Sequence, residues 1–198
     1  SSVSLSSDNS TIAATFSEAV YTTTGGSGAL VVGDFALSIS GGVAVLSSPT
    51  PSSISISGNV YTLGISLSGT PNGAETITVD PASSTAIYDG ADNAAAASRS
   101  NNTATLNDQT GPAVTITSTL TSPTNTSPIP VTMTFSESVT GFESGDVTIS
   151  NGTLSNFSGS GSTYTLNVIP SSEGAVTVDV KGNVSQDTDG NGNSAALQ

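Results

Sequence analysis

The sequence predicts an all-β protein that consists of two tandem β-sandwiches without disulfide bonds. Apolar and polar residues alternate with a period of two along most of the chain, and helical periodicity is almost absent. Turns rich in Gly, Asn, Ser and Pro separate the alternating segments. The chain has 198 residues and no cysteine. Two domains of about 100 residues, a common size for a sandwich, fit this length better than one large domain.

The first half of the chain supplies a full set of predicted strands. Its polar first residues are already strand-like, and in the segments that follow every second residue is apolar, as in a strand with one face on a core. A last strand is expected at 103–106. Residues Ala94 to Ala97 are the only locally helical stretch and suffice for one turn at most. The alternating segments are 12–16, 35–39, 54–56, 61–67 and 77–79.

The second half repeats this pattern but lacks room for a last strand. Five residues follow Asn193, whereas 15 residues lead from Asn93 to Asp108 in the first half. We therefore expect the last strand to be truncated and the sheet edge to be open. Two explanations stay open. Either the given sequence is cut within the domain, or a strand from another chain completes the sandwich. The alternating segments of this half are 114–116, 131–135, 147–149, 164–168 and 176–180.

An internal repeat indicates that a whole domain has been duplicated. The segment Thr15–Val20 reads TFSEAV and recurs as TFSESV at Thr134–Val139. Turn-forming residues from Leu106 to Pro112 precede the point where the pattern restarts. The sequence therefore predicts domains at 1–108 and 109–198. Further matches pair Tyr61–Leu63 with Tyr164–Leu166, Thr78–Asp80 with Thr177–Asp179, Asp89-Gly90 with Asp189-Gly190, and Asn93 with Asn193.

The composition excludes several classes of function. Without His or Cys, the chain cannot hold a Ser-His-Asp triad, a cysteine nucleophile or a zinc site with nitrogen and sulfur ligands. Two basic against 15 acidic residues give a net charge of −13, which argues against nucleic acid and anionic membranes as partners. No apolar stretch approaches the ~20 residues that cross a bilayer, so we expect no membrane insertion. Hard cations, which bind oxygen ligands, remain as partners.

The strongest local motif is the segment Asp187–Asn193, DTDGNGN. Asp187, Asp189 and Asn191 place oxygen ligands at alternate positions, and Gly192 allows the sharp turn that a calcium loop needs at its sixth residue. The twelfth position would be Gln198 instead of a bidentate Glu, and no helices flank the loop, so an EF-hand is rejected. We expect a calcium loop that takes a carboxylate from elsewhere in the fold, and Asn193 is a further candidate ligand. The alternative is an Asn- and Gly-rich turn that needs no ion.

Several short motifs together resemble bacterial Ig-like repeats. They are the Phe-Ser-Glu strand end, the Gly-Asp-Phe or Gly-Asp-Val start of the next strand, the Tyr-Thr-Leu strand, the late Asp-Gly-x-x-Asn loop and the linker Asp108–Pro112. The resemblance covers nearly the whole chain. It implies two immunoglobulin-like sandwiches, an extracellular or cell-surface location, and a spacer or adhesive role in a bacterial surface or secreted protein.

An Ig-like topology would bring further carboxylates to the calcium loop. In such a sandwich, the loop after the second strand and the loop between the last two strands lie at the same end. Glu137 follows the predicted strand 131–135, and Asp108 lies on the linker that enters this end. We expect both to join the calcium loop, although Glu137 could also be a solvated residue at a strand end. By repeat logic, a weaker site of the first domain would use Glu18, Asp89, Asp92 and Asn93.

These observations favour a non-enzymatic module that calcium makes rigid and whose partners are Ca²⁺ and neighbouring repeats of the same chain. A glycosidase would need an aromatic platform around its carboxylates, but the chain has no Trp and only 5% aromatic residues. One alternative is a module that binds a polysaccharide or a host ligand, for which Tyr88 beside Asp89 is the available aromatic residue. Another is a filament subunit in which another copy of the chain donates a strand.

Overall fold

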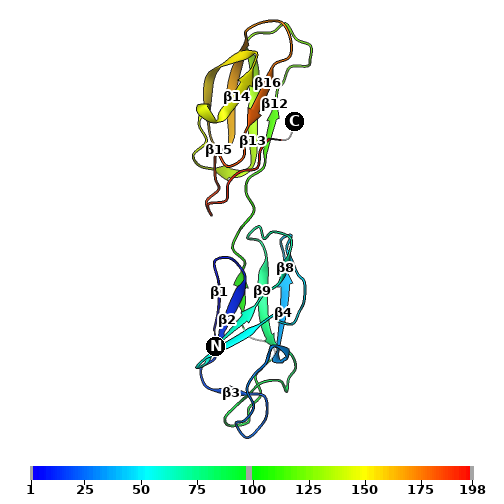
Figure 1. Ribbon diagram of the computed structural model, residues 1–198, viewed down its shortest axis with the longest axis vertical. Coiled ribbons are helices and arrows are strands. Elements are labelled where there is room, and N and C mark those ends of the chain that lie inside the picture. Colours follow the sequence, from blue (N-terminus) through cyan, green and yellow to red (C-terminus); the bar gives the residue numbers. More distant parts are fainter. Residues whose placement is uncertain (1, 97–99, 197–198) are drawn as a thin grey trace. The chain divides into compact units, whose positions relative to one another are not determined.

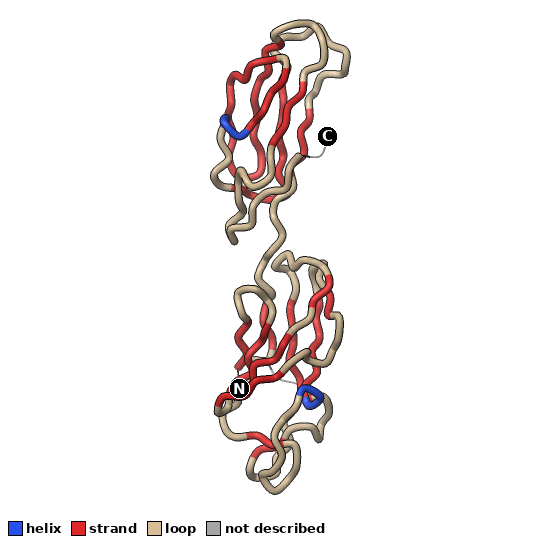
Figure 2. Tube along the Cα trace, viewed as in Figure 1, coloured by secondary structure: helices blue, strands red, loops and turns tan. Residues whose placement is uncertain are grey.

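The computed structural model describes residues 2–96 and 100–196, and the chain forms two compact units, Ser1–Gln109 and Thr110–Gln198. Both units are built from antiparallel strands, as predicted, and the only helical elements in the described ranges are two short 3₁₀ turns (Figures 1 and 2). These turns are η1, Val32–Asp34, and η2, Ser144–Asp146. Each unit is described by itself below.

The first unit is a sandwich of a four-stranded and a three-stranded sheet (Figure 1). Two short strand pairs, β3 with β10 and β5 with β8, extend it. The four-stranded sheet has the order β1 (Ser2–Leu5), β2 (Thr11–Thr15), β7 (Val60–Gly64) and β6 (Ile54–Ser57). The facing sheet has the order β11 (Thr103–Thr105), β9 (Thr76–Pro81) and β4 (Phe35–Ser40). The short strands are β3 (Val20–Tyr21), β10 (Tyr88–Asp89), β5 (Val45–Leu46) and β8 (Leu67–Ser68).

The core of the first unit consists of the alternate residues of these strands. Ile12 on β2 lies opposite Leu63 on β7, and both are fully buried, as is Ile77 on β9 of the facing sheet. Each such side chain contributes about 1.5–3 kcal/mol through removal of apolar surface from water. The ring of Tyr61 packs between the sheets, with its centroid 5.4 Å from that of Phe16 in an edge-on arrangement. The period-two pattern therefore sets which residues face the core.

The second unit has a three-stranded sheet that faces a two-stranded sheet. Within β15 the chain folds back on itself, because Gly159 lies against Thr163 and Gly152 against Val168. Gly159 and Gly161 have positive φ and make this reversal possible. The three-stranded sheet has the order β12 (Val114–Thr117), β13 (Ile129–Val139) and β15 (Gly152–Pro170). The facing sheet pairs β14 (Val147–Ser150) with β16 (Thr177–Val180).

Aromatic rings fill much of the core of the second unit. Phe135 on β13 is 2% exposed and packs edge-on against Phe142 and Tyr164, with centroid separations of 5.1 and 6.0 Å. Met133 and Val168 are fully buried beside them. Edge-on pairs add about 0.5–1.5 kcal/mol each to the contribution of their buried area.

Each alternating segment of the sequence overlaps a strand, and the differences from expectation are local. Residues 94–96 form no helix, and Ala94 instead pairs with Tyr88 in an isolated bridge, while Ala97 lies outside the described residues. Phe16 is half-buried because it lies beside a small cavity. The four two-residue strands of the first unit and the 3₁₀ turns were not predicted, since they are too short to show periodicity.

The last described residues of the second unit do not complete a strand. Ser194 donates its N–H to the carbonyl of Pro112, and Ala196 donates to the carbonyl of Val180, at distances of 2.9 and 3.0 Å. Among the described residues, β16 is paired on one side only, with β14. The expectation of an open edge stays a prediction, because Leu197 and Gln198 lie outside the described ranges.

Candidate functional site

The loop that follows β16 is folded around the carboxylate of Asp187. Asp187 is 3% exposed, and its Oδ1 accepts hydrogen bonds from the backbone N–H groups of Asp189 and Asn191 at 2.8 and 2.9 Å. Its Oδ2 accepts one from Nδ2 of Asn191 at 2.9 Å. Burial raises the pKa of Asp187, but the hydrogen bonds from Asn191, Asp189 and Gly190 outweigh burial and hold the pKa below its ordinary value. The loop therefore contains a buried, ionised carboxylate at neutral pH.

Glu137 lies beside this buried carboxylate. It is half-buried and lies near the end of β13, where the pairing with β15 shifts in register between Thr134 and Val139. One carboxylate oxygen of Glu137 lies within 4.8 Å of one of Asp187. Two like charges at this distance repel each other, and a cation between them would turn the repulsion into attraction. Carboxylate oxygens are ligands that Ca²⁺ prefers.

The linker that precedes the second unit runs directly against the Asp187 loop. A Cβ on Gly111 would collide with the carbonyl oxygen of Gly192, so the two backbones are in close contact there. The next residue, Pro112, accepts the hydrogen bond from Ser194. Asp108 precedes Gly111 by three residues, which span at most about 10 Å when extended.

The start of the linker is held by the first unit. The backbone N–H of Asn107 donates to Oδ1 of Asn9, and Nδ2 of Asn9 donates to the carbonyl of Asn107, both at 2.9 Å. Gln109 donates its N–H to the carbonyl of Pro71 at 3.0 Å. Asp108 lies between these two anchored residues, so the position of its backbone is defined with respect to the first unit.

The side chain of Asn193 links several parts of the loop through hydrogen bonds. It is 2% exposed, and its Oδ1 accepts three hydrogen bonds, from the N–H of Val184 and from the N–H and hydroxyl of Ser185. Its Nδ2 donates to the carbonyls of Lys181 and Ser194 at 2.9 and 2.8 Å. All five bonds close the loop on itself. Asp189, by contrast, is exposed, and its backbone N–H holds Asp187.

The corresponding loop of the first unit has the same hydrogen-bond pattern as the Asp187 loop. The residues that correspond in this pattern are not the ones that the sequence match had paired. Asp89 accepts from the N–H of Ala91 and from the N–H and Nδ2 of Asn93, at 2.8, 2.9 and 2.8 Å. The bonds from Asn93, followed by that from Ala91, lower the pKa of Asp89. Asp89 therefore corresponds to Asp187 and not to Asp189, and Asn93 corresponds to Asn191. The sequence comparison aligned Asp89-Gly90 with Asp189-Gly190, which differs by two residues from the correspondence that the hydrogen bonds define.

The first unit does not gather its candidate carboxylates. Glu18 is exposed, and the carboxylate of Asp92 accepts a hydrogen bond from the N–H of Gly25 in the neighbouring loop. Within the described ranges, no group of three carboxylates that includes Glu18, Asp89 or Asp92 comes together as closely as Glu137 and Asp187 do. Among the described residues, Glu18, Asp89 and Asp92 therefore form no such carboxylate cluster.

Sequence reasoning missed one fully buried carboxylate, that of Glu75. Its Oε1 accepts hydrogen bonds from the N–H groups of Val43 and Ala44 at 2.7 and 2.8 Å, and its Oε2 from that of Asn72 at 3.1 Å. A Cβ on Gly42 would overlap this side chain. The available signal was a lone Glu at the start of a strand, together with the pair Gly41-Gly42. Backbone N–H groups satisfy this anion without a metal.

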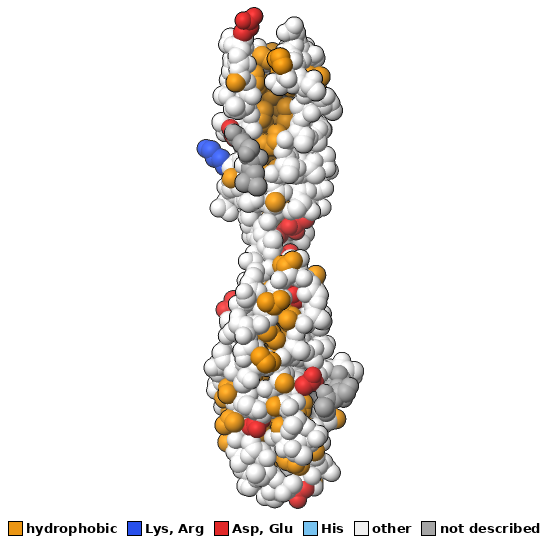
Figure 3. Space-filling view, turned by 90° about the vertical axis from the view of Figure 1, so that its right-hand side faces the viewer, with side chains coloured by type: hydrophobic (Ala, Val, Ile, Leu, Met, Phe, Trp, Pro, Cys, Tyr) orange, Lys and Arg blue, Asp and Glu red, His pale blue; other side chains and the backbone are white. Residues whose placement is uncertain are grey.

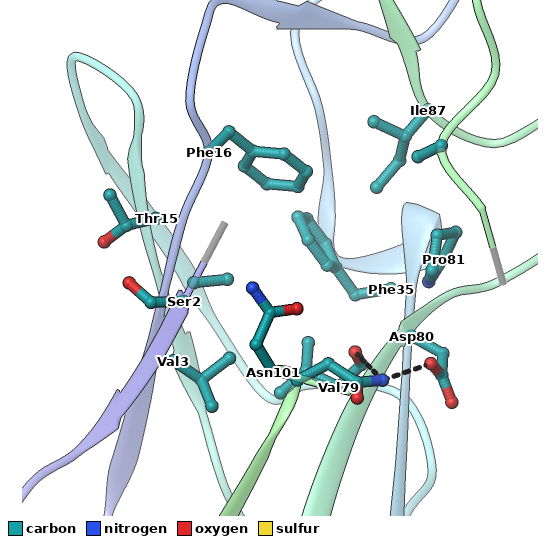
Figure 4. A pocket seen from close by; sticks show the side chains of 13 residues that line it. Ser2, Val3, Thr15, Phe16, Phe35, Val79, Asp80, Pro81, Ile87 and Asn101 are labelled. Carbon is teal, nitrogen blue, oxygen red and sulfur yellow. Dashed lines mark hydrogen bonds between the residues drawn. The ribbon is translucent and has the colours of Figure 1, made fainter. Parts of the chain in front are cut away.

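A small cavity in the first unit also went unpredicted. Phe16, Phe35 and Ile87 line it, and its volume of about 40 Å³ leaves room for ordered water (Figure 4). Asn102 donates from Nδ2 to the carbonyl of Val79 and to Oδ1 of Asp80, while its buried Oδ1 has no partner among the described residues.

Two facing antiparallel sheets around a single core, without a disulfide bond, define each unit as an immunoglobulin-like β-sandwich. Residues 108–198 match the family model of the bacterial Ig-like domain. The match begins at Asp108, whereas the compact first unit extends to Gln109. No curated protein and no solved structure matches the chain.

The matched family indicates the general type of the second domain. Bacterial Ig-like domains are non-catalytic modules of a structural or adhesive type, and they typically occur in extracellular or surface proteins. The described residues contain no helix that is long and apolar enough to span a bilayer.

Proposed function

We propose that the chain is a non-enzymatic structural or adhesive segment of an extracellular bacterial protein, and that Ca²⁺ stiffens the linker that enters its second domain. The family match supports the first part. The proposal that Ca²⁺ stiffens the linker rests on the distance between the Glu137 and Asp187 carboxylate oxygens, which is within 4.8 Å. Both lie at the loop against which the linker packs.

The proposed ligands come from three segments. Asp187 offers Oδ2, Glu137 offers a carboxylate oxygen, and Asp108 reaches the site from the linker. Exposed Asp189 and the amide oxygen of Asn191 are further oxygen donors on the same loop. Water completes the six to eight oxygen ligands that Ca²⁺ takes. Mg²⁺ should bind poorly, because it demands a tighter octahedral shell and gives up its water reluctantly.

The mechanical effect follows from where the linker is held. Asn107 and Gln109 are bonded to the first unit, and Pro112 and Ala113 are bonded to the second. Residues 110 and 111 separate these two sets along the chain, and the proposal places the hinge there. A cation shared by Asp108, Glu137 and Asp187 would restrain this hinge. The repeats would then set the length of the segment, and the cation would set its stiffness.

The test compares thermal unfolding of the second domain in calcium and in chelator, followed by the NMR signals of its amides. Calcium at 100 times its dissociation constant adds about 2.7 kcal/mol of stability, which corresponds to a melting shift on the order of 10 °C. Glu137→Gln should remove most of this shift. Glu18→Gln is the matched control, since Glu18 occupies the same motif in the first unit but is exposed, and it should leave the shift unchanged. Curves that superimpose in calcium and chelator would refute the proposal.

A further inference from the structure

The outward face of the three-stranded sheet of the second unit carries a regular array of threonines, which we call the Thr array. In the register of β12, β13 and β15, Thr115 lies opposite Thr134, and Thr134 lies opposite Thr163. A second row with the same arrangement lies two residues further along each strand. Five of the six side chains are exposed, and that of Thr132 on the central strand is half-buried. The second row consists of Thr117, Thr132 and Thr165.

The sheet is regular where the Thr array lies. Pairing between β13 and β15 runs without a break from Ile129 to Thr134, and the shift in register comes only after Thr134. Neighbouring strands in a sheet are about 4.8 Å apart, and alternate residues of one strand are about 6.8 Å apart. Three of the hydroxyls also share one geometry, since each donates to a backbone carbonyl of the adjacent strand segment. They belong to Thr115, Thr117 and Thr165, and they bond the carbonyls of Thr134, Thr132 and Ser158 at 3.2, 3.5 and 3.4 Å.

The first unit shows that the fold does not require these threonines. Thr15 matches Thr134 in the repeated motif, and Tyr61 matches Tyr164. The register then assigns a counterpart to each member of the Thr array, and only two of these six counterparts are Thr. The general preference of strands for Thr therefore does not account for the array by itself. The counterparts of Thr115, Thr117, Thr132, Thr134, Thr163 and Thr165 are Ser2, Ser4, Ala13, Thr15, Val60 and Thr62, in this order.

The Thr array is uncharged, and so are its neighbours in the register. Pro130 and Asn167 face each other beside the second row. Charged side chains are also few on the side of the chain that Figure 3 shows. The outward residues of these strands therefore offer no charge to a bound ion and no aromatic ring to a sugar. They offer hydroxyl and methyl groups at fixed spacings, and ordered water is the partner that hydroxyl groups in such an arrangement hold.

Ice is ordered water whose oxygens repeat at fixed spacings on each crystal face, and some of these spacings are close to those of the Thr array. Hydroxyls at such positions can take the places of water oxygens, while methyl groups fit between them. We propose that the Thr array binds ice and is an adhesive face of this module that works independently of calcium. Adjacent strands are rotated by about 20–25° against each other, which limits the match to this small array. We therefore expect adsorption to ice and inhibition of recrystallisation instead of a large freezing-point depression.

The test measures how much of the 198-residue chain enters ice that grows slowly on a cold surface from a dilute solution with chelator. The wild-type chain should be enriched in the ice severalfold over a protein of similar size that does not bind ice. Thr132→Ala combined with Thr163→Val introduces the residues of the first unit at two positions of the array, and it should lower the enrichment to that background. Thr148→Val is the control, because Thr148 is exposed on β14 of the facing sheet, and it should leave the enrichment unchanged.

Amide NMR spectra show whether each variant folds, and Thr163→Val alone, at an exposed position, should also lower the enrichment if the double variant unfolds. The proposal is overturned if the wild-type chain enters ice no more than the background protein, or if Thr148→Val has the same effect as the array variants. Retention on insoluble cellulose through the same threonines, without enrichment in ice, would overturn it as well, because the face would then bind a polysaccharide. The chelator separates this test from the calcium proposal, whose readout is the melting shift.

Discussion

Replacement of Glu75 by Gln should destabilise the first domain, because this carboxylate is fully buried and bonded to three backbone N–H groups. In the variant, the single amide oxygen of the new side chain can keep the bonds from Val43 and Ala44, but its amide nitrogen then faces the N–H of Asn72. Hydrogen bonds to a charged group contribute about 1.5–3 kcal/mol and neutral ones about 0.5–1.5 kcal/mol. Two weakened bonds and one broken bond predict a loss of about 3–5 kcal/mol.

The assay is urea unfolding at pH 7, with amide signals of each domain followed separately by NMR. For a domain of this size, the same loss lowers the melting temperature by about 15 °C or more. Glu173→Gln is the control, since Glu173 is exposed in the second domain and should change stability by less than about 0.5 kcal/mol.

The pH dependence gives an independent check on the role of Glu75. Burial raises its pKa, but the hydrogen bonds from Ala44, Val43 and Asn72 outweigh burial and lower the pKa below its ordinary value. A lowered folded-state pKa means that the stabilisation is present above the unfolded pKa of about 4.3, and is lost as pH falls through the folded pKa. The stability gap between wild type and Glu75→Gln should therefore shrink below about pH 4.3. A gap that is absent at pH 7, or that does not change with pH, would refute the reasoning.

Three further substitutions test the second domain by the same unfolding assay. Phe135→Ala should cost about 3–5 kcal/mol, and a loss below ~1 kcal/mol would mean that its place in the core is wrong. Asn193→Ala should cost about 2–4 kcal/mol, because it leaves three buried donors of the loop without their shared acceptor, and an unchanged midpoint would contradict this. Gly111→Ala should destabilise this domain through its collision with Gly192, whereas Gly145→Ala, with open space around it, should be neutral, and equal effects would count against the close approach.

The longer strands could be predicted from the sequence, because burial of one face appears within each segment as apolar residues at every second position. Ile12 and Leu63 face each other in the core, and both follow from period-two alternation within their own segments. The half-burial of Phe16 could not be read in this way, since it depends on a cavity formed by distant segments. Glu75 went unnoticed for the same reason, because its hydrogen-bond donors Val43 and Ala44 belong to a turn about 30 residues earlier.

The candidate site was predictable in part. The topology of an Ig-like sandwich led us to expect Glu137 beside the loop of Asp187, and their carboxylate oxygens lie within 4.8 Å. Calcium binding itself stays a prediction. The roles within the loop were not predictable, because the letters alone do not show that Asn193 points inward as a brace while Asp189 points outward. Likewise, only the hydrogen bonds show that Asp89 corresponds to Asp187.

The central claim is that calcium stiffens the linker between two structural modules. The most direct measurement is ¹⁵N relaxation of both domains in the intact chain, with calcium and with chelator. We predict that the domains share a single, longer rotational correlation time in calcium, and that chelator lets them tumble more independently. Rotational correlation times that are the same in calcium and chelator would contradict the account.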